Sequence, residues 1–429
     1  MKKIFLIFIA CNMLSSCSYL SRNFETLAEN KSTRSLPQKS NRNYCPASSN
    51  IQYISEDEPS LKFYRSLHPT LFENKNANFV QKSIMLALLE LSRRPDQASP
   101  YSRFQVYLKF NGRTYYYDFR PKDLVDDTKM PYLKALDMLT REFVPGTSLV
   151  QIASNMDAAI PKSIGVSLEF ETFLKENQKD LLKNDILAQR FFKGDEVLTK
   201  YESFERINYR QIIDQYTALA SKNSDYEFNV NGLTSNISKK ENFQVNCNYD
   251  LEKETTLTDE IINAELKKTH YMGISEGDNF FIAVSSGTLF RPLKTGKMGY
   301  FMKTRPSPIA LPICEFKGKN QEIILFSNDG RNPVQHLQHL DAYDIDQVDS
   351  VAAMNELLSF SRHLFLSAPE RILYESKRGR KAQLDFFLEM NFPIYHVESL
   401  GNIFGHATFK TESTLYSDDR SSARLWCKE

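Results

Sequence analysis

The stretch that decides the fold reads Phe104-Gln-Val-Tyr-Leu-Lys-Phe110, then Asn111-Gly112, then Arg113-Thr-Tyr-Tyr-Tyr-Asp-Phe119. Two runs rich in aromatic residues flank an Asn-Gly pair, which is a strong signal of a β-hairpin with a two-residue turn. Because side chains alternate along a strand, such a turn gives three facing pairs on one side of the hairpin. The predicted pairs are Leu108 with Tyr115, Val106 with Tyr117, and Phe104 with Phe119.

Helical patterns surround this hairpin in the first half of the chain. Apolar side chains recur at helical spacing over residues 78–91, and Arg94-Pro95 ends the pattern. A second helical stretch is predicted over residues 199–221. We therefore expect residues 46–235 to be a mainly helical region that the hairpin at 104–119 interrupts.

The second half of the chain has a different pattern. Short apolar runs at residues 280–284 and 323–326 lie between turn signals and are typical of strands. Helices are predicted over residues 348–365 and 381–390, and residues 394–426 return to strand-like patterns. Asp346 and Asp349 lie at the start of the first of these helices and are expected to cap it.

These patterns predict an α+β fold: a helix-rich N-terminal half with one β-hairpin, followed by a C-terminal half that contains an antiparallel sheet. The expected organisation is a signal peptide at residues 1–16, a tether at 17–45, the helical region at 46–235 and the α+β region at 236–429.

Composition excludes several classes of protein. The 429 residues include 54 basic and 53 acidic side chains, and the net charge of +1 gives no general attraction to nucleic acid. A hydrophobic share of 41% is normal for a folded protein. Beyond the amino terminus no apolar run approaches the ~20 residues that a transmembrane helix needs. We expect a neutral folded body without a nucleic-acid partner or a cofactor.

The amino terminus has the layout of a secretory signal. Lys2 and Lys3 precede an apolar run over residues 4–14, and small residues follow in Leu14-Ser15-Ser16-Cys17. Residues 1–18 resemble bacterial lipoprotein precursors, in which a cysteine follows an aliphatic residue and two small ones. The resemblance implies removal of residues 1–16 and lipidation of Cys17. The alternative is an ordinary secreted protein with a chance cysteine near its signal.

The resemblance also implies a location in the cell envelope. Two or more acyl chains anchor a protein stably, whereas one chain binds a membrane only reversibly. The polar residues after Cys17 are expected to form a flexible tether. Ser18, in place of an aspartate, implies the outer membrane rather than the inner one. The expected partners are the membrane, through the anchor, and an envelope protein or an anionic lipid.

The cysteines agree with export. Once Cys11 is removed and Cys17 is lipidated, four remain: Cys45, Cys247, Cys314 and Cys427. An even number in an exported chain permits two disulfides with three possible connectivities. Cys247 and Cys314 both lie in strand-like runs, so this pair is favoured. Cys45 would then join Cys427 and tie the two ends of the folded region together. Four buried free thiols are the alternative.

A possible metal site lies in His336-Leu-Gln-His339-Leu-Asp341. On a helix, residues three apart share a face, so both imidazoles could reach one ion, with Asp341 as an oxygen ligand. The alternative is a polar helix face followed by acidic residues at a helix start.

Two further motifs have simpler explanations. Four cations among residues 377–381, namely Lys377, Arg378, Arg380 and Lys381, are a candidate anion-binding site, or else a solvated loop. Gly273-Ile-Ser-Glu-Gly277 matches a nucleophile-elbow pattern, but it leads into a strand instead of a helix, so we interpret it as a turn.

No convincing catalytic set emerges from these residues. The preferred interpretation is a membrane-anchored envelope lipoprotein that binds or organises partners without catalysis. The alternative is an envelope hydrolase, either metal-dependent through His336, His339 and Asp341 or using His396 as a general base.

Overall fold

The computed structural model describes residues 43–74, 76–121, 129–220, 226–228, 233, 235–240, 243–248, 269–328, 333–342, 345–367, 370–378, 381–410, 412–420 and 424–428. The predicted signal peptide, Cys17 and nearly all of the tether lie outside these residues. None of the described helices combines the length and the apolar character needed to cross a bilayer.

An eight-stranded antiparallel sheet forms the centre of the molecule, with strand order β21-β1-β11-β12-β2-β3-β8 and β13 paired to β12. Its strands come from both halves of the sequence: four precede residue 236 and four follow it. The strands are β1 (Ile51–Ser55), β2 (Arg103–Phe110), β3 (Arg113–Pro121), β8 (Tyr226–Phe228), β11 (Thr269–Glu276), β12 (Asn279–Leu289), β13 (Thr304–Pro306) and β21 (Arg424–Lys428).

A six-stranded antiparallel sheet packs against the first one, with strand order β20-β19-β15-β14-β10-β9. Its strands are β9 (Ser235–Lys240), β10 (Phe243–Asn248), β14 (Ile313–Lys317), β15 (Gln321–Asn328), β19 (Asn402–Phe409) and β20 (Ser413–Ser417). An inter-sheet core joins the two sheets, because side chains such as Tyr271, Ile282 and Val284 meet Ile324 and Phe404 there.

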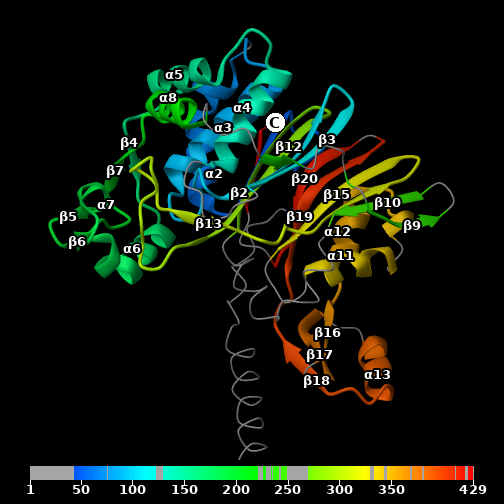
Figure 1. The fold of residues 1–429 in the computed structure, drawn as a ribbon. Coiled ribbons are helices and arrows are strands. Elements are labelled where there is room, and N and C mark those ends of the chain that lie inside the picture. The colour runs from blue at the N-terminus through cyan, green and yellow to red at the C-terminus, as the bar shows by residue number, and fades with distance from the viewer. Residues whose placement is uncertain are drawn as a thin grey trace, which may run out of the picture.

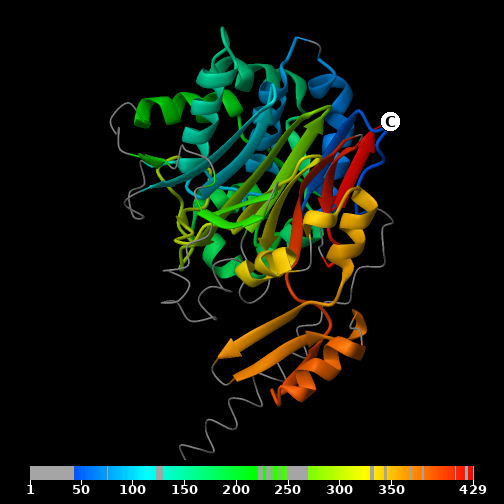
Figure 2. The same cartoon turned by 90° about the vertical axis from the view of Figure 1, so that its right-hand side faces the viewer.

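Helices cover the outer face of each sheet, as Figures 1 and 2 show. On the first sheet lie α2 (Glu58–Leu67), α3 (Phe79–Arg93) and α4 (Pro131–Phe143), with α5 (Leu149–Ala159) and α8 (Tyr209–Ala220) packed on them. A π-helical turn, His68–Phe72, follows α2. On the second sheet lie α11 (Pro333–Ala342), a 3₁₀ turn (Ile345–Gln347) and α12 (Val351–Ser359). The architecture is a four-layer αββα sandwich.

The predicted hairpin is confirmed, including its register. Leu108 faces Tyr115, Val106 faces Tyr117 and Phe104 faces Phe119. Asn111 and Gly112 adopt positive φ angles of 52° and 74°, which the two-residue turn requires. All six facing side chains point to the helical layer and pack in the core beneath α3 and α4.

Two smaller units extend from the sandwich. A lateral lobe contains β4 (Ser163–Gly165), α6 (Leu168–Leu181), α7 (Asp185–Phe191), β5 (Phe192–Lys193), β6 (Glu196–Val197) and β7 (Ser203–Glu205) around its own core. A small sheet contains β16 (His363–Ser367), β17 (Glu370–Glu375) and β18 (Ile394–Val397), with α13 (Lys381–Glu389) beside it.

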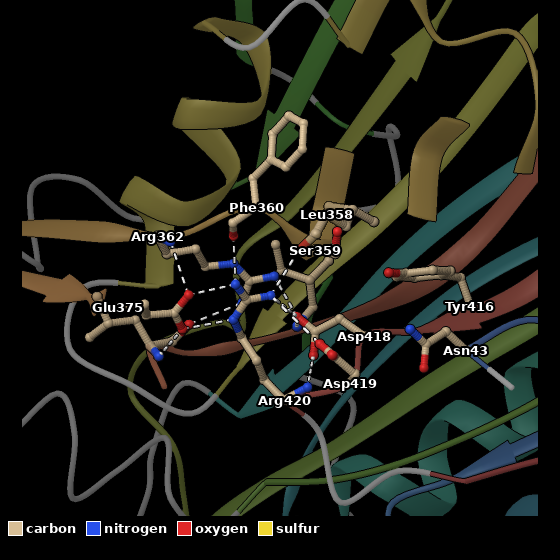
Figure 3. A network of polar contacts seen from close by, with 12 residues as sticks. Asn43, Leu358, Ser359, Phe360, Arg362, Glu375, Tyr416, Asp418, Asp419 and Arg420 are labelled. Carbon is tan, nitrogen blue, oxygen red and sulfur yellow. Dashed lines mark hydrogen bonds and ion pairs between the residues drawn. The ribbon is translucent and has the colours of Figure 1, made fainter. Parts of the chain in front are cut away.

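A buried ionic network joins the small sheet to the sandwich (Figure 3). Arg420 donates through Nε to Glu375 at 2.7 Å and through Nη1 to the Leu358 carbonyl at 2.8 Å. Arg362 pairs with Asp418. Because the Arg420 and Glu375 side chains are fully buried, removal of either one would leave an unpaired charge in a dry environment.

Two predicted helices are shorter than expected. In the predicted helix over residues 199–221, Ser203–Glu205 instead pairs with Ser163–Gly165, and the helix begins only at Tyr209. Phe204 enters the core of the lateral lobe from this strand, so tertiary packing overrides the helical pattern.

The helix predicted over residues 348–365 spans only Val351–Ser359. Ser350, and neither Asp346 nor Asp349, caps it, because the Ser350 hydroxyl accepts a hydrogen bond from the Ala353 amide. The chain then enters β16. The helices predicted over 78–91 and 381–390 are confirmed as α3 and α13.

Both favoured disulfides are confirmed: Cys45–Cys427 and Cys247–Cys314. The second links two neighbouring strands, β10 and β14, at facing positions. The first links the start of the described chain to β21, an edge strand of the central sheet.

The Cys45–Cys427 bond should stabilise the fold more than the other bond does. It closes a sequence separation of 382 residues against 67. Loop-closure entropy predicts that Cys45→Ser with Cys427→Ser lowers the free energy of unfolding by about 2–5 kcal/mol, some 1–2 kcal/mol more than the matched Cys247→Ser with Cys314→Ser pair. Urea denaturation measures both; an equal loss, or the reverse order, contradicts this prediction.

Candidate functional site

A polar site lies where the inter-sheet core ends. The last layer of that core is aromatic: Tyr271 stacks on Phe404 with 3.7 Å between ring centroids, and Phe404 stacks on Phe326 at 5.3 Å. Two residues further along the same strand faces, polar side chains replace the apolar ones, because side chains two apart share a face. The apolar layer therefore seals one side of a polar layer.

Four side chains form this polar layer, which we call the inter-sheet site: Thr269 on β11, Ser286 on β12, Asn328 on β15 and Asn402 on β19. The register pairs Thr269 with Ser286 in the first sheet and Asn328 with Asn402 in the second. Two hydroxyls on one sheet thus face two carboxamides on the other.

The inter-sheet site is buried and incompletely hydrogen-bonded. Its residues are between 0% and 6% exposed. Ser286 Oγ, Asn328 Oδ1 and Asn402 Oδ1 have no hydrogen-bond partner among the described residues. Because buried polar atoms normally find partners, three such atoms at one sheet end indicate a place that receives a polar ligand or water.

Arg103 borders the inter-sheet site but does not offer a free cation. It faces Ser286 in the register of β2 and β12. Its guanidinium donates to Asp118 through Nε at 2.7 Å and to the Ser307 and Pro308 carbonyls at 3.3 and 3.0 Å. These bonds satisfy the charge of Arg103. Its role is therefore to connect β2 to β3 and to the Ser307-Pro308 segment beside the inter-sheet site.

A buried acid–base cluster fixes the start of β11 from the opposite face of the sheet. His270, next to Thr269, contacts Glu90 of α3 through Nε2 and lies 3.2 Å from Glu56 through Nδ1. Tyr64 of α2 donates to the other oxygen of Glu90. The cluster thereby joins both helices to the strand that carries Thr269.

The charge state of His270 follows from these contacts. Burial lowers the pKa of the imidazole, but the Glu90 charge and the hydrogen bonds to Glu56 and Glu90 outweigh it and raise the pKa to about 9. His270 is therefore an imidazolium at neutral pH. Nearby, burial raises the pKa of Asp57, but Arg94 with His270 and Arg93 lowers it to about 2.

The predicted metal site has no support in the described structure. His336 is 2% exposed, and its two ring nitrogens have no partner among the described residues; His339 instead stacks on His363 at 4.3 Å. Burial and the neighbouring Arg362 charge lower the pKa of both His336 and His339. The same positive charge would repel a cation.

The side chain of Asp341 lies outside the described residues. Among those that are described, no group of three or more His, Cys, Asp or Glu side chains is placed to hold a metal ion. His396, the proposed general base, is exposed on β18, which belongs to the small sheet and not to either sheet of the inter-sheet site.

The predicted anion-binding run is partly neutralised by acidic neighbours. Lys377 donates to Glu398 at 2.5 Å, and Arg378 donates to both oxygens of Asp419 at 2.8 Å. Arg380 and the side chain of Lys381 lie outside the described residues, so anion binding by this run stays a prediction.

The match to a nucleophile elbow is a turn, as expected. Ser275 lies within β11 and faces Gln52 on β1 and Phe280 on β12. Gly277 adopts a φ of +59° in the turn that leads into β12. The strand therefore continues into a hairpin, without the strand-to-helix bend that exposes a nucleophile.

None of the four residues of the inter-sheet site was predicted from the sequence. They belong to no local motif, because they come from four strands spread over residues 269–402. One signal was available: an apolar run ends in a polar pair at Ser285-Ser286 and again at Ser327-Asn328. Only the pairing of the strands shows that these ends meet.

Two antiparallel sheets between helical layers, with a buried polar site where the sheets end, define the class as an αββα sandwich. No protein-family model and no curated protein matches the sequence. Solved structures do share the fold. The cephalosporin acylase from Bacillus halodurans has a TM-score of 0.56 at 12% identity, over 92% of this chain and 99% of its own. Two structures of LmbA2991 have TM-scores of 0.57 and 0.56 at 8% identity, over 91% of this chain and 100% of theirs.

This likeness corrects the functional expectation. The preferred interpretation of the sequence was a non-catalytic protein that binds or organises partners, and that interpretation is contradicted because the fold shared over almost the whole chain is that of an acylase. It relied on the lack of a catalytic motif in the sequence.

His270 should make stability depend on pH. Its pKa rises from an ordinary 6.5 to about 9 on folding, so its contribution is complete below pH 6.5 and disappears as the pH rises through 9. We expect a loss of about 3 kcal/mol in the free energy of unfolding over this range.

Denaturation at several pH values tests this prediction. His270→Gln should remove most of the decline, whereas the control His396→Gln, at an exposed position, should keep it. Parallel pH profiles for wild type and His270→Gln would contradict the assignment.

Proposed function

We propose that the protein is a hydrolase that cleaves acyl–amide or related acyl bonds at the inter-sheet site. The αββα fold, which it shares with a cephalosporin acylase, supports the reaction class. The observation that carries the proposal is the buried Ser286 hydroxyl without a hydrogen-bond partner among the described residues, facing Thr269 in the register.

The chemistry of the four side chains suits acyl transfer. A Ser or Thr hydroxyl can attack the carbonyl carbon and form an ester intermediate as the bond from that carbon to the amine or alcohol breaks. The departing group takes up the hydroxyl proton, and water then hydrolyses the ester to release the free acid and restore the hydroxyl. Ser286 and Thr269 are the two candidates for this oxygen. The carboxamide N–H groups of Asn328 and Asn402 can donate to the oxyanion that develops, and such donors are most effective in a buried site. No metal is part of this proposal.

Mutation can distinguish the roles of the Ser286 and Thr269 hydroxyls. Ser286→Ala or Thr269→Val should lower kcat/KM on acyl p-nitroanilides and acyl esters by more than about 100-fold. The matched control is Ser285→Ala: it is one residue away on the same strand, but its hydroxyl faces the helical layer and donates to the Gln97 carbonyl.

Covalent labelling identifies which of the two hydroxyls is the nucleophile. Whichever hydroxyl is the nucleophile should also be labelled by a fluorophosphonate or acylating probe, and peptide mass spectrometry identifies it. Hydrolysis that survives in both Ser286→Ala and Thr269→Val, or the same loss in Ser285→Ala, rejects the inter-sheet site as the catalytic centre.

We also propose that the mature protein is a lipoprotein anchored through Cys17, in the outer membrane. The support is the sequence of residues 1–18, where a cationic start, an apolar run and two small residues precede the cysteine. Cys17→Ser should abolish the mass of the acyl chains and move the protein from the membrane to the soluble fraction. Cys11→Ser should change neither, because residue 11 is removed. A membrane-bound Cys17→Ser protein would contradict the proposal.

A further inference from the structure

A second site lies at the other end of the central sheet, on its helical face. A cavity of about 670 Å³ opens there between the starts of β1 and β12, the ends of β11, β2 and β21, and the beginning of α3. Glu276 closes β11 at this end, and Thr269 begins β11 at the inter-sheet site. Thr269 and Glu276 are seven positions apart along the strand, about 23 Å, so the cavity is distinct from the inter-sheet site.

The charged residues that line this cavity form two ion pairs. Lys82 of α3 donates to both oxygens of Glu276 at 2.8 Å, and Lys428 of β21 pairs with Glu73. The Lys82 side chain is 9% exposed and lies deep, whereas those of Glu276, Lys428 and Glu73 are 34%, 37% and 45% exposed at the rim. The cavity therefore presents two positive and two negative groups, and its formal charge is zero.

A neutral histidine fixes the rim ammonium. Lys428 Nζ lies 3.0 Å from His68 Nε2, and His68 Nδ1 lies 3.0 Å from the Tyr53 hydroxyl. Burial and the Lys428 charge lower the pKa of His68. An imidazole that accepts from Lys428 carries its proton on Nδ1 and donates it to Tyr53. His68 thus fixes the position of the Lys428 ammonium, and Lys428 lines the cavity.

Most of the remaining lining is apolar. Phe72, Phe79, Phe110 and the smaller Ile51 and Ala77 line the same cavity, together with the polar residues Asn50 and Asn279. Aromatic walls beside a few fixed polar groups are the usual composition of a small-molecule site, where the apolar surface supplies affinity and the charges supply orientation.

From this arrangement we propose that the cavity binds a small zwitterion with an apolar body, such as an α-amino acid with an aromatic or branched side chain. Its ammonium would pair with Glu276 and Glu73, and its carboxylate with Lys82 and Lys428. A ligand with both charges keeps the cavity neutral, whereas a ligand with only one leaves a charge uncompensated next to the apolar walls. The apolar body would lie against the three phenylalanines.

The chain has an internal reporter for this binding. Trp426 is its single tryptophan, and it stacks on Tyr53 at 5.1 Å and meets the edge of His68 at 5.2 Å. His68 contacts Lys428 directly. A carboxylate that engages Lys428 should therefore change the fluorescence of Trp426, which can be excited where phenylalanine does not absorb.

In the experiment, the purified protein without its predicted signal peptide is titrated with L-phenylalanine, and Trp426 fluorescence and the heat of binding are measured. We expect saturable binding below about 10 mM. Removing one ligand charge, as in phenethylamine or 3-phenylpropanoate, should weaken binding at least about tenfold, and so should Glu276→Gln or Lys82→Met. The matched control is Lys109→Met, since the Lys109 side chain is buried to a similar degree as that of Lys82 and forms an ion pair with Glu322, which does not line the cavity.

Three results would overturn the proposal: no saturation by L-phenylalanine, wild-type affinity in both Glu276→Gln and Lys82→Met, or equal binding of phenylalanine and 3-phenylpropanoate. Glu276→Gln replaces a carboxylate at the rim, 34% exposed, by an amide of the same shape, so it remains informative if Lys82→Met fails to fold. Ser286→Ala should bind L-phenylalanine like wild type, which keeps this test independent of the proposed hydrolysis.

Discussion

The burial of β11 and β12 on both faces is the constraint on which the rest of the structure depends. One face meets the helices through Met272, Ile274 and Phe281, and the other meets the second sheet through Tyr271 and Ile282. Water reaches neither face, so every polar group on these strands needs a protein partner or a ligand. Polar groups are accordingly confined to the strand ends, and both proposed sites lie there.

The two ends of β11 are held in different ways. At its start, the imidazolium of His270 is neutralised by Glu90 and Glu56 on the helical side, while Thr269 faces the inter-sheet site. At its end, Glu276 bonds Lys82 of the same helix that carries Glu90. Helix α3 therefore contacts the strand at both ends, from the face opposite the inter-sheet site.

Peripheral parts of the chain complete the sandwich. The edge strand β21 is covalently tied to Cys45 and supplies Lys428 to the charged cavity. The small sheet is attached through the buried Arg420–Glu375 pair, which also reaches the carbonyls that end α12. These long-range connections join residues more than 40 positions apart, so they order the chain without any local sequence signal.

The sequence by itself determined the elements whose information is local. The Asn111-Gly112 turn set the register of the hairpin, the apolar period set α3, and two of the four cysteines in strand-like runs indicated how both disulfides pair. The remaining features depend on tertiary structure. Phe204 lies in a strand because its side chain packs in the core of the lateral lobe. The inter-sheet site forms because the two sheets end at the same place, which brings together Thr269, Ser286, Asn328 and Asn402. Hydrogen-bonded turns and helical periods are encoded within a few residues, whereas a site made from four strands exists only after those strands have paired and packed.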